Sequence, residues 1–85
     1  MNRIIIDVRE QIEFKMGHVE GAINMPLSLL KTGTPLLDNI PKDIELIVYC
    51  NTGNRSAVSQ NILYSMGYTN VVNGINREIV EVNYL

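Results

Sequence analysis

The clearest chemistry in this sequence lies in one loop, Cys50-Asn51-Thr52-Gly53-Asn54-Arg55. Gly53 can adopt backbone angles that are closed to other residues, so the loop can curl into a bowl of inward-pointing amides that binds an anion. Arg55 adds a permanent positive charge at the start of the next predicted helix. In such a field the pKa of a cysteine falls from about 8.5 to between about 3.5 and 7.5. The pattern therefore predicts a nucleophilic thiolate at Cys50.

The alternative for Cys50 is a buried cysteine that only fills space, since free cysteines are among the most buried residues. Gly53 and Arg55 at these offsets favour the reactive thiol. Cys50 is the only cysteine, which excludes a disulfide within the chain. Cys50 and His18 cannot by themselves complete a tetrahedral zinc site, so we expect no metal.

The distance from cysteine to arginine bears on which anion the bowl fits. Cysteine phosphatases carry a loop one residue longer, which makes room for a tetrahedral phosphate. Here four residues intervene, Asn51 to Asn54, and Ser56 follows Arg55. The tighter bowl suits a persulfide sulfur on Cys50 or the terminal sulfur of thiosulfate. The spacing thus favours sulfur transfer over phosphoryl transfer.

The elements that position this loop follow from the hydrophobic pattern. Glu45–Tyr49 is a nearly continuous apolar run, which predicts a strand that is covered on both faces and leads into Cys50. A helix is predicted over Arg55–Met66, with Gly67 as its C-terminal stop. The apolar residues of that helix recur at helical spacing: Val58, Ile62, Leu63 and Met66.

Shorter elements are predicted on both sides of this strand and helix. Further strands are expected at Arg3–Val8, Ala22–Met25 and Asn70–Asn73. A short helix is expected at Arg9–Met16, helical turns at Leu27–Lys31 and Leu36–Ile40, and a weakly helical or irregular tail at Ile75–Leu85. Strands alternating with helices predict an α/β fold with a parallel sheet, in which ligands bind at the carboxyl edge. Cys50 lies at that edge.

Composition restricts the classes of function. A length of 85 residues predicts one domain over residues 1–85, with a thin core margin, and 46% hydrophobic residues indicate a folded chain. The net charge of −2 and the scattered basic residues disfavour a nucleic-acid partner. No apolar run reaches the about 18–20 residues of a membrane span, and the first residues do not resemble a signal peptide. We therefore expect a cytoplasmic protein with no membrane partner.

Nearly the whole chain resembles the rhodanese family. The resemblance rests on Ile6–Glu10, Gly17–Val19, Gly21–Pro26, Val48–Cys50, the loop with Gly53 and Arg55-Ser56, Met66–Tyr68 and Val71–Gly74. The loop length is specific for this family, because the related phosphatases carry a longer loop. The resemblance implies a small three-layer domain with a parallel sheet of about four strands, in the order 4-3-1-2, flanked by short helices.

By the same resemblance, the chain is similar to single-domain thiosulfate sulfurtransferases. It implies that Cys50 carries a persulfide, that the loop amides cradle its outer sulfur, and that Arg55 helps to hold loop and substrate. The implied partners are a small sulfur donor such as thiosulfate and an acceptor, either cyanide or a thiol, with no cofactor. The substrate-binding residues are expected to be Asn51, Thr52, Gly53, Asn54, Arg55 and Ser56.

Several residues are expected to support the site without reacting. Asp7 and Arg9 belong to the family pattern near this edge, and a salt bridge or a hydrogen bond to the loop is expected of them. His18 is expected to be structural, because thiolate attack on sulfur needs no base. Ser56 is expected to cap a helix, with a hydrogen bond to the Cys50 sulfur as the alternative.

Two positions depart from the family pattern. Asn51 stands where arginine is common, which removes a positive charge near the pocket mouth and affects thiosulfate affinity. Ile75 stands where glycine is usual, and Asn76-Arg77-Glu78 lacks a common aromatic residue. We therefore expect a rearranged wall beside the active site.

The leading hypothesis is ping-pong transfer of a sulfane sulfur through a Cys50 persulfide. Two alternatives stay open. One is a non-catalytic persulfide carrier or binding module that a partner protein loads or unloads. The other is a phosphatase-like enzyme, which the short loop disfavours.

Overall fold

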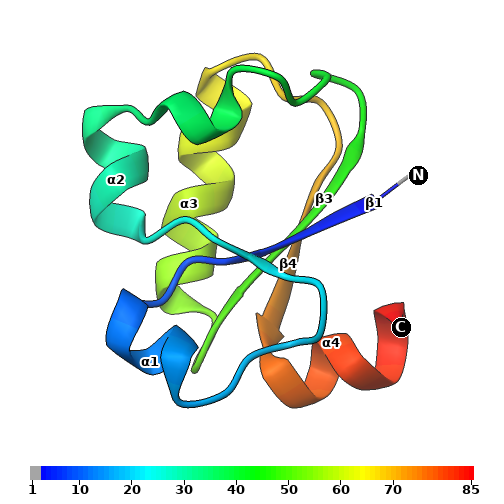
Figure 1. The fold of residues 1–85 in the computed structure, drawn as a ribbon. Helices are drawn as coiled ribbons and strands as arrows, with labels where there is room; N and C mark the ends of the chain where they lie inside the picture. Colours follow the sequence, from blue (N-terminus) through cyan, green and yellow to red (C-terminus); the bar gives the residue numbers. More distant parts are fainter. Residues whose placement is uncertain (1–2) are drawn as a thin grey trace.

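The computed structural model describes residues 3–85 and is built around a parallel sheet (Figure 1). The strands are β1 (Arg3–Asp7), β2 (Ile23–Asn24), β3 (Glu45–Cys50) and β4 (Val71–Asn76). They lie in the order β2-β1-β3-β4, and every pairing is parallel. This is the order 4-3-1-2 counted from the other edge, so the predicted fold class is confirmed.

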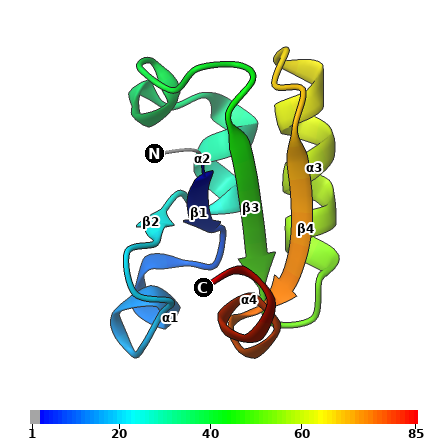
Figure 2. The same ribbon diagram turned by 90° about the vertical axis from the view of Figure 1, so that its right-hand side faces the viewer.

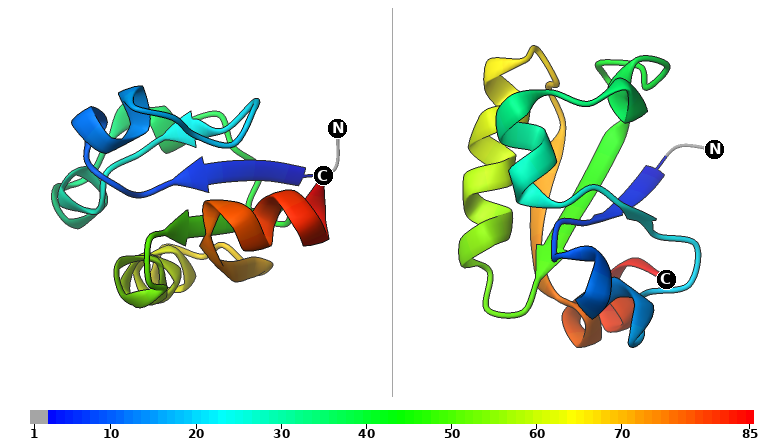
Figure 3. Two further views of the ribbon diagram at one scale, coloured as in Figure 1. Left: turned by 90° about the horizontal axis from the view of Figure 1, so that it is seen from below. Right: turned by 60° about the vertical axis from the view of Figure 1, so that its left-hand side comes forward.

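The helices cover both faces of this sheet. They are α1 (Gln11–Lys15), α2 (Leu27–Thr32), the 3-10 helix η1 (Pro35–Leu37), α3 (Asn54–Ser65) and α4 (Arg77–Tyr84). In Figure 2, α2 and α3 lie behind the sheet and α4 lies in front of it. The right-hand view of Figure 3 places α1 and α4 near the carboxyl end of β3. The parallel strands therefore end next to helices that can contribute to a site.

Each face of the sheet has its own apolar cluster. The larger cluster packs under α2 and α3 and contains Ile6, Val8, Met25, Leu30, Leu37, Leu46, Val48, Cys50, Leu63, Tyr68 and Val71. The smaller one packs under α4 and contains Val19, Ile47, Tyr49 and Val80. Alternate residues of β3 contribute to opposite clusters, as the period of two in a strand requires. Burial on both faces explains the continuous apolar run of β3.

The ladder between β3 and β4 contains one irregularity. Val48 pairs with Asn73 but Tyr49 pairs with Ile75, so Gly74 is an extra residue in β4. A Cβ at Gly74 would lie 2.6 Å from Val80 Cγ2 and 2.9 Å from Ile47 Cγ2, so α4 packs where only glycine fits. Ile75 has a φ of 75°, a left-handed conformation that branched residues rarely adopt. The shift turns the end of β4 toward the loop after β3.

The C-terminal part of the chain differs from the sequence prediction. The tail forms the regular helix α4 rather than a weakly helical or irregular segment, and β4 continues to Asn76. The Asn76 side chain caps α4 by accepting a hydrogen bond from the Ile79 amide at 2.8 Å. Val80 is fully buried against the sheet. The N-cap and one buried apolar contact explain why this short segment is helical.

The buried side of α3 also differs from the prediction. Val58 and Met66 are exposed, whereas the buried residues are Ser56, Ser59 and Leu63. Small serines let the helix lie close to the sheet, and the Ser59 hydroxyl is satisfied by the Arg55 carbonyl at 2.8 Å. Within residues 3–85, none of the helices has the length and apolar character needed to cross a membrane.

Candidate active site

Cys50 is the last residue of β3, at the carboxyl edge of the sheet, and its side chain is 1% exposed. The chain then turns through Gly53, which has a φ of 90° and stands as the N-cap of α3. The Gly53 amide donates a hydrogen bond to the Cys50 sulfur at 3.1 Å. The left-handed glycine thus aims a backbone donor at the sulfur from the start of a helix.

The environment lowers the pKa of the Cys50 thiol from 9.0 to about 7. Burial raises this pKa, but the hydrogen bonds that the ionised sulfur can accept from the Ser56 hydroxyl and from the amides of Ser56, Thr52 and Gly53 outweigh it. These donors favour the charged form of the sulfur. A substantial fraction of the thiol is therefore ionised near neutral pH.

Ser56 lies beneath the sulfur and is not the cap of α3. The capping position belongs to Gly53, and Ser56 is the third residue of the helix. Its Oγ atom lies 3.5 Å from Cys50 Sγ and donates to the Asn73 Oδ1 atom at 2.6 Å. The default expectation of a capping serine is therefore wrong, and the contact with the sulfur is present.

Arg55 is paired with a carboxylate that the sequence did not single out. Its Nη1 and Nη2 atoms donate to Glu13 at 2.7 and 3.2 Å. The bond to Glu13 raises the pKa of Arg55, and the bond to Arg55 lowers the pKa of Glu13. Glu13 also accepts from the Glu10 amide as part of a capping box, so α1 is fixed while it holds the arginine. The Glu10-x-x-Glu13 spacing after β1 is the sequence feature from which this capping box, and so the position of Glu13, could have been predicted.

Asp7 and Arg9 form a buried ion pair beneath this edge. Asp7 is fully buried and accepts from Arg9 Nη2 at 2.7 Å and from the Tyr49 hydroxyl at 2.9 Å. The Tyr49 oxygen in turn accepts from the Val19 amide at 3.0 Å, and burial raises the Tyr49 pKa to about 12. The network connects the end of β1 to β3 one residue before Cys50.

The other predicted residues lie around the loop. The side chains of Asn51, Thr52 and Asn54 are exposed at its surface. The His18 ring stacks on Phe14 with centroids 3.6 Å apart, and its Nδ1 atom hydrogen-bonds to the Phe14 carbonyl at 2.8 Å. Within residues 3–85 there is no cluster of three or more His, Cys, Asp or Glu side chains that could hold a metal ion.

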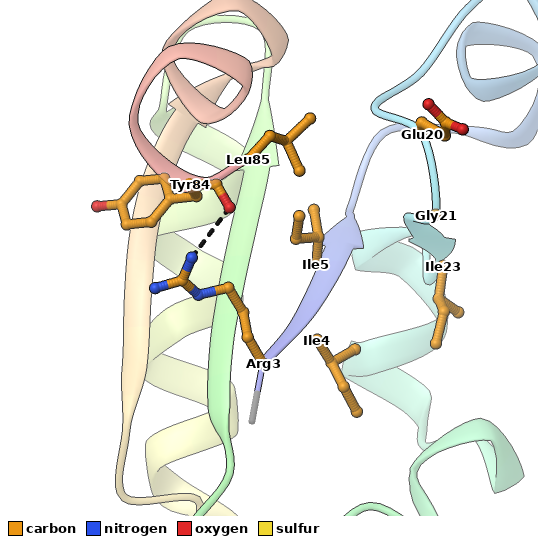
Figure 4. A pocket seen from close by; sticks show the side chains of 8 residues that line it. All are labelled: Arg3, Ile4, Ile5, Glu20, Gly21, Ile23, Tyr84 and Leu85. Atoms are coloured by element: carbon orange, nitrogen blue, oxygen red, sulfur yellow. Dashed lines mark hydrogen bonds between the residues drawn. The ribbon is translucent and has the colours of Figure 1, made fainter. Parts of the chain in front are cut away.

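A cavity of about 340 Å³ lies elsewhere, between the end of α4 and strands β1 and β2 (Figure 4). Its lining residues are Arg3, Ile4, Ile5, Glu20, Gly21, Ile23, Tyr84 and Leu85. None of the residues from Cys50 to Ser56 is among them. The candidate chemistry therefore belongs to the loop at the carboxyl edge and not to this cavity.

The rhodanese-like domain family matches residues 1–75 of the chain. This match covers the strand that ends at Cys50, the loop and α3. The chain belongs to the rhodanese family.

Relatives and solved structures agree with this assignment. The thiosulfate sulfurtransferase PspE of Escherichia coli is 43% identical over 70 residues, which are 80% of this chain and 64% of that protein. The structure of a rhodanese with anions from E. coli matches with a TM-score of 0.80 and 36% identity, over 91% of this chain and 89% of that one. The human single-domain sulfurtransferase TSTD1 matches with a TM-score of 0.76 and 27% identity, over 94% and 82% of the two chains. The present chain thus spans less than two thirds of the PspE sequence.

Proposed function

We propose that this chain is a sulfurtransferase that moves a sulfane sulfur through a persulfide on Cys50. The observation that carries the proposal is the Gly53 amide 3.1 Å from the Cys50 sulfur, in a loop with only four residues between cysteine and arginine. The thiol pKa of about 7 supports a thiolate nucleophile at neutral pH. Membership of the rhodanese family supports sulfur, rather than phosphate, as the group transferred.

The proposed reaction has two displacements at sulfur. The Cys50 thiolate attacks the outer sulfur of thiosulfate, a new S–S bond forms, and sulfite leaves with the electron pair of the old S–S bond. Cyanide or a thiolate then attacks the outer sulfur of the persulfide, and the Cys50 thiolate leaves. No net oxidant or cofactor is needed. The amides of Asn51 to Ser56 would cradle the outer sulfur, while Asp7 and Arg9 would support the edge.

A protein-borne persulfide is the second candidate for the sulfur donor. Thiosulfate is a dianion, yet position 51 is a neutral asparagine and Glu13 partly neutralises Arg55. Both features reduce the positive charge offered to a small dianion. They favour a carrier that a partner protein loads, in which the same Cys50 holds the sulfur. The single domain over residues 1–85 and the cytoplasmic location remain predictions.

Thiosulfate:cyanide transfer with intact-mass analysis tests this proposal. Wild type is expected to gain the mass of one sulfur atom from the donor and to lose it on addition of cyanide. Cys50→Ser should do neither while keeping the fold by circular dichroism. Full transfer activity in Cys50→Ser would contradict the proposal. Loading from a persulfidated protein but not from thiosulfate would favour the carrier, and Cys50-dependent hydrolysis of an aryl phosphate would favour the phosphatase.

A further inference from the structure

The side chain of Asn73 connects three segments around the Cys50 sulfur. It lies in β4 next to the ladder shift, and its Nδ2 atom donates to the Gly53 carbonyl at 3.1 Å. Its Oδ1 atom accepts from the Ile75 amide at 3.0 Å and from the Ser56 hydroxyl at 2.6 Å. One amide therefore joins the loop after β3, the first turn of α3 and the left-handed residue of β4.

The orientation of this amide is fixed by two of its partners. A backbone carbonyl can only accept and a backbone amide can only donate. Rotating the Asn73 amide by half a turn would place a donor against the Ile75 amide and an acceptor against the Gly53 carbonyl. Both bonds would be lost. The oxygen therefore faces Ser56, and the Ser56 hydroxyl is the donor in the short contact at 2.6 Å.

This assignment has a consequence for the sulfur. Ser56 has one hydroxyl hydrogen, which points to Asn73 and so cannot also point to Cys50. In this arrangement the 3.5 Å contact with Ser56 is made by the thiol hydrogen of Cys50. When the sulfur is ionised, the hydroxyl must turn away from Asn73 to stabilise it. The Gly53 amide remains a donor in both states, and Asn73 holds the carbonyl of that same residue.

We propose that Asn73 is a positioning residue of the sulfur site, which braces Gly53 toward Cys50 and competes with Cys50 for the Ser56 hydroxyl hydrogen. The proposal rests on Cys50 being the reacting group of the proposed sulfur transfer. The two actions have opposite effects on the stability of the Cys50 thiolate. The brace stabilises the thiolate by holding the Gly53 amide in place, whereas the competition destabilises it by keeping the Ser56 hydroxyl hydrogen on Asn73. The charged groups around the sulfur site are Arg55, Glu13 and the Asp7–Arg9 pair. Asn73 is neutral and bonds to none of them, so replacing it removes no charge.

A double-mutant cycle on thiol acidity tests the proposal without any sulfur donor. The rate of Cys50 alkylation by iodoacetamide is measured against pH in wild type, Ser56→Ala, Asn73→Ala and the double variant. In the Ser56→Ala background there is no serine hydroxyl to compete for, so Asn73→Ala removes the brace on Gly53 together with the acceptor of the Ile75 amide, and the pH midpoint of alkylation should rise by about half a unit or more. In the wild-type background the rise should be smaller, because the freed Ser56 hydroxyl turns to the sulfur.

The controls separate positioning from folding. All rates are taken at temperatures below the thermal unfolding midpoint of each variant. Asn73→Leu, which keeps the branching at Cγ but has no polar atoms, replaces Asn73→Ala if the alanine variant does not fold. Asn61→Ala, at an exposed position of α3, should leave the alkylation midpoint unchanged. A lower unfolding temperature with an unmoved midpoint in the Ser56→Ala background would overturn the brace. Equal shifts in both backgrounds would overturn the competition. If sulfur transfer fails but these shifts appear, the proposed function is wrong, and Asn73 still sets the acidity of the Cys50 thiol.

Discussion

The two faces of the sheet are held by different forces. The face under α2 and α3 carries the larger apolar cluster, which includes Cys50, and the buried polar residues of α3 on this face are Ser56 and Ser59. The face under α4 has a small apolar cluster, which contains Tyr49, and the hydroxyl of Tyr49 joins it to the Asp7–Arg9 ion pair. The first face contains most of the buried apolar side chains. The second fixes geometry through directional bonds at the edge where Cys50 lies.

The largest expected effect is loss of the buried carboxylate. Asp7→Ala leaves Arg9 buried without its partner and the Tyr49 hydroxyl without its acceptor, which should lower the free energy of unfolding by about 3–5 kcal/mol. Urea denaturation measures the change. Glu45→Ala, which breaks the partly exposed pair with Arg3, is the matched control and should cost below about 1 kcal/mol. Equal losses of unfolding free energy in the two variants would show that the buried Asp7–Arg9 pair contributes no more to stability than the partly exposed pair.

The apolar face is tested at Leu63, which is fully buried in α3. Leu63→Ala removes buried methyl groups and leaves a cavity, which should lower the free energy of unfolding by about 3 kcal/mol. The substitution should change the stability of the fold and leave the acidity of the Cys50 thiol unchanged. The pH midpoint of Cys50 alkylation in the folded variant should equal that of wild type. A shifted midpoint would show that packing under α3, and not only the polar edge, sets thiol acidity.

Gly74 tests the close approach of α4 to the sheet. Gly74→Ala places a Cβ against Val80 and Ile47 and should cost about 2 kcal/mol through overpacking. Adding Val80→Ala removes the nearest atom, so the double variant should lose less than the sum of the two single losses. Thermal unfolding of the three variants measures this. Additive losses would indicate that the helix shifts away instead of clashing.

The smallest effect is the dependence of stability on the ionisation of Cys50. Its pKa is lowered in the folded state, from 9.0 to about 7, so folding favours the thiolate. The stabilisation is fully present above about pH 9 and is lost as the pH falls through about 7. Relative to Cys50→Ser, wild type should gain about 1–2 kcal/mol between pH 6 and 9 in urea denaturation. A difference that stays constant over this range would show that the fold does not favour the thiolate.

The features that could be predicted from the sequence are those formed by a single contiguous segment of the chain. The four strands could be predicted because each is a short apolar run, and the sheet order came from the family resemblance. The loop from Cys50 to Arg55 is likewise a single segment. The pairing of Arg55 with Glu13 could not be predicted in the same way, because the two residues are 42 positions apart and meet only through the sheet.

The remaining differences have local physical causes. The tail forms a helix because Asn76 caps it and Val80 is buried. Asn76 is a favoured N-cap residue, and Val80 and Tyr84 are four positions apart, so the sequence carried a signal that the prediction did not use. The role of Asn73 depends on the extra residue at Gly74, since this shift sets where the end of β4 meets the loop. A change of register cannot be found from the alternation of apolar residues when the strand contains an asparagine and a glycine.

The parallel sheet also limits how fast this chain can fold. Parallel strands cannot be joined by a tight hairpin, and β1 pairs with β3 through Arg3 and Glu45, which are 42 positions apart. Every such pairing requires closure of a long loop before it yields contacts. The chain should therefore fold in about milliseconds or more slowly, whereas helical proteins of this size fold in about microseconds to milliseconds. Until β3 is inserted between β1 and β4, the edges of those strands are open to other chains, and low concentration should favour refolding over aggregation.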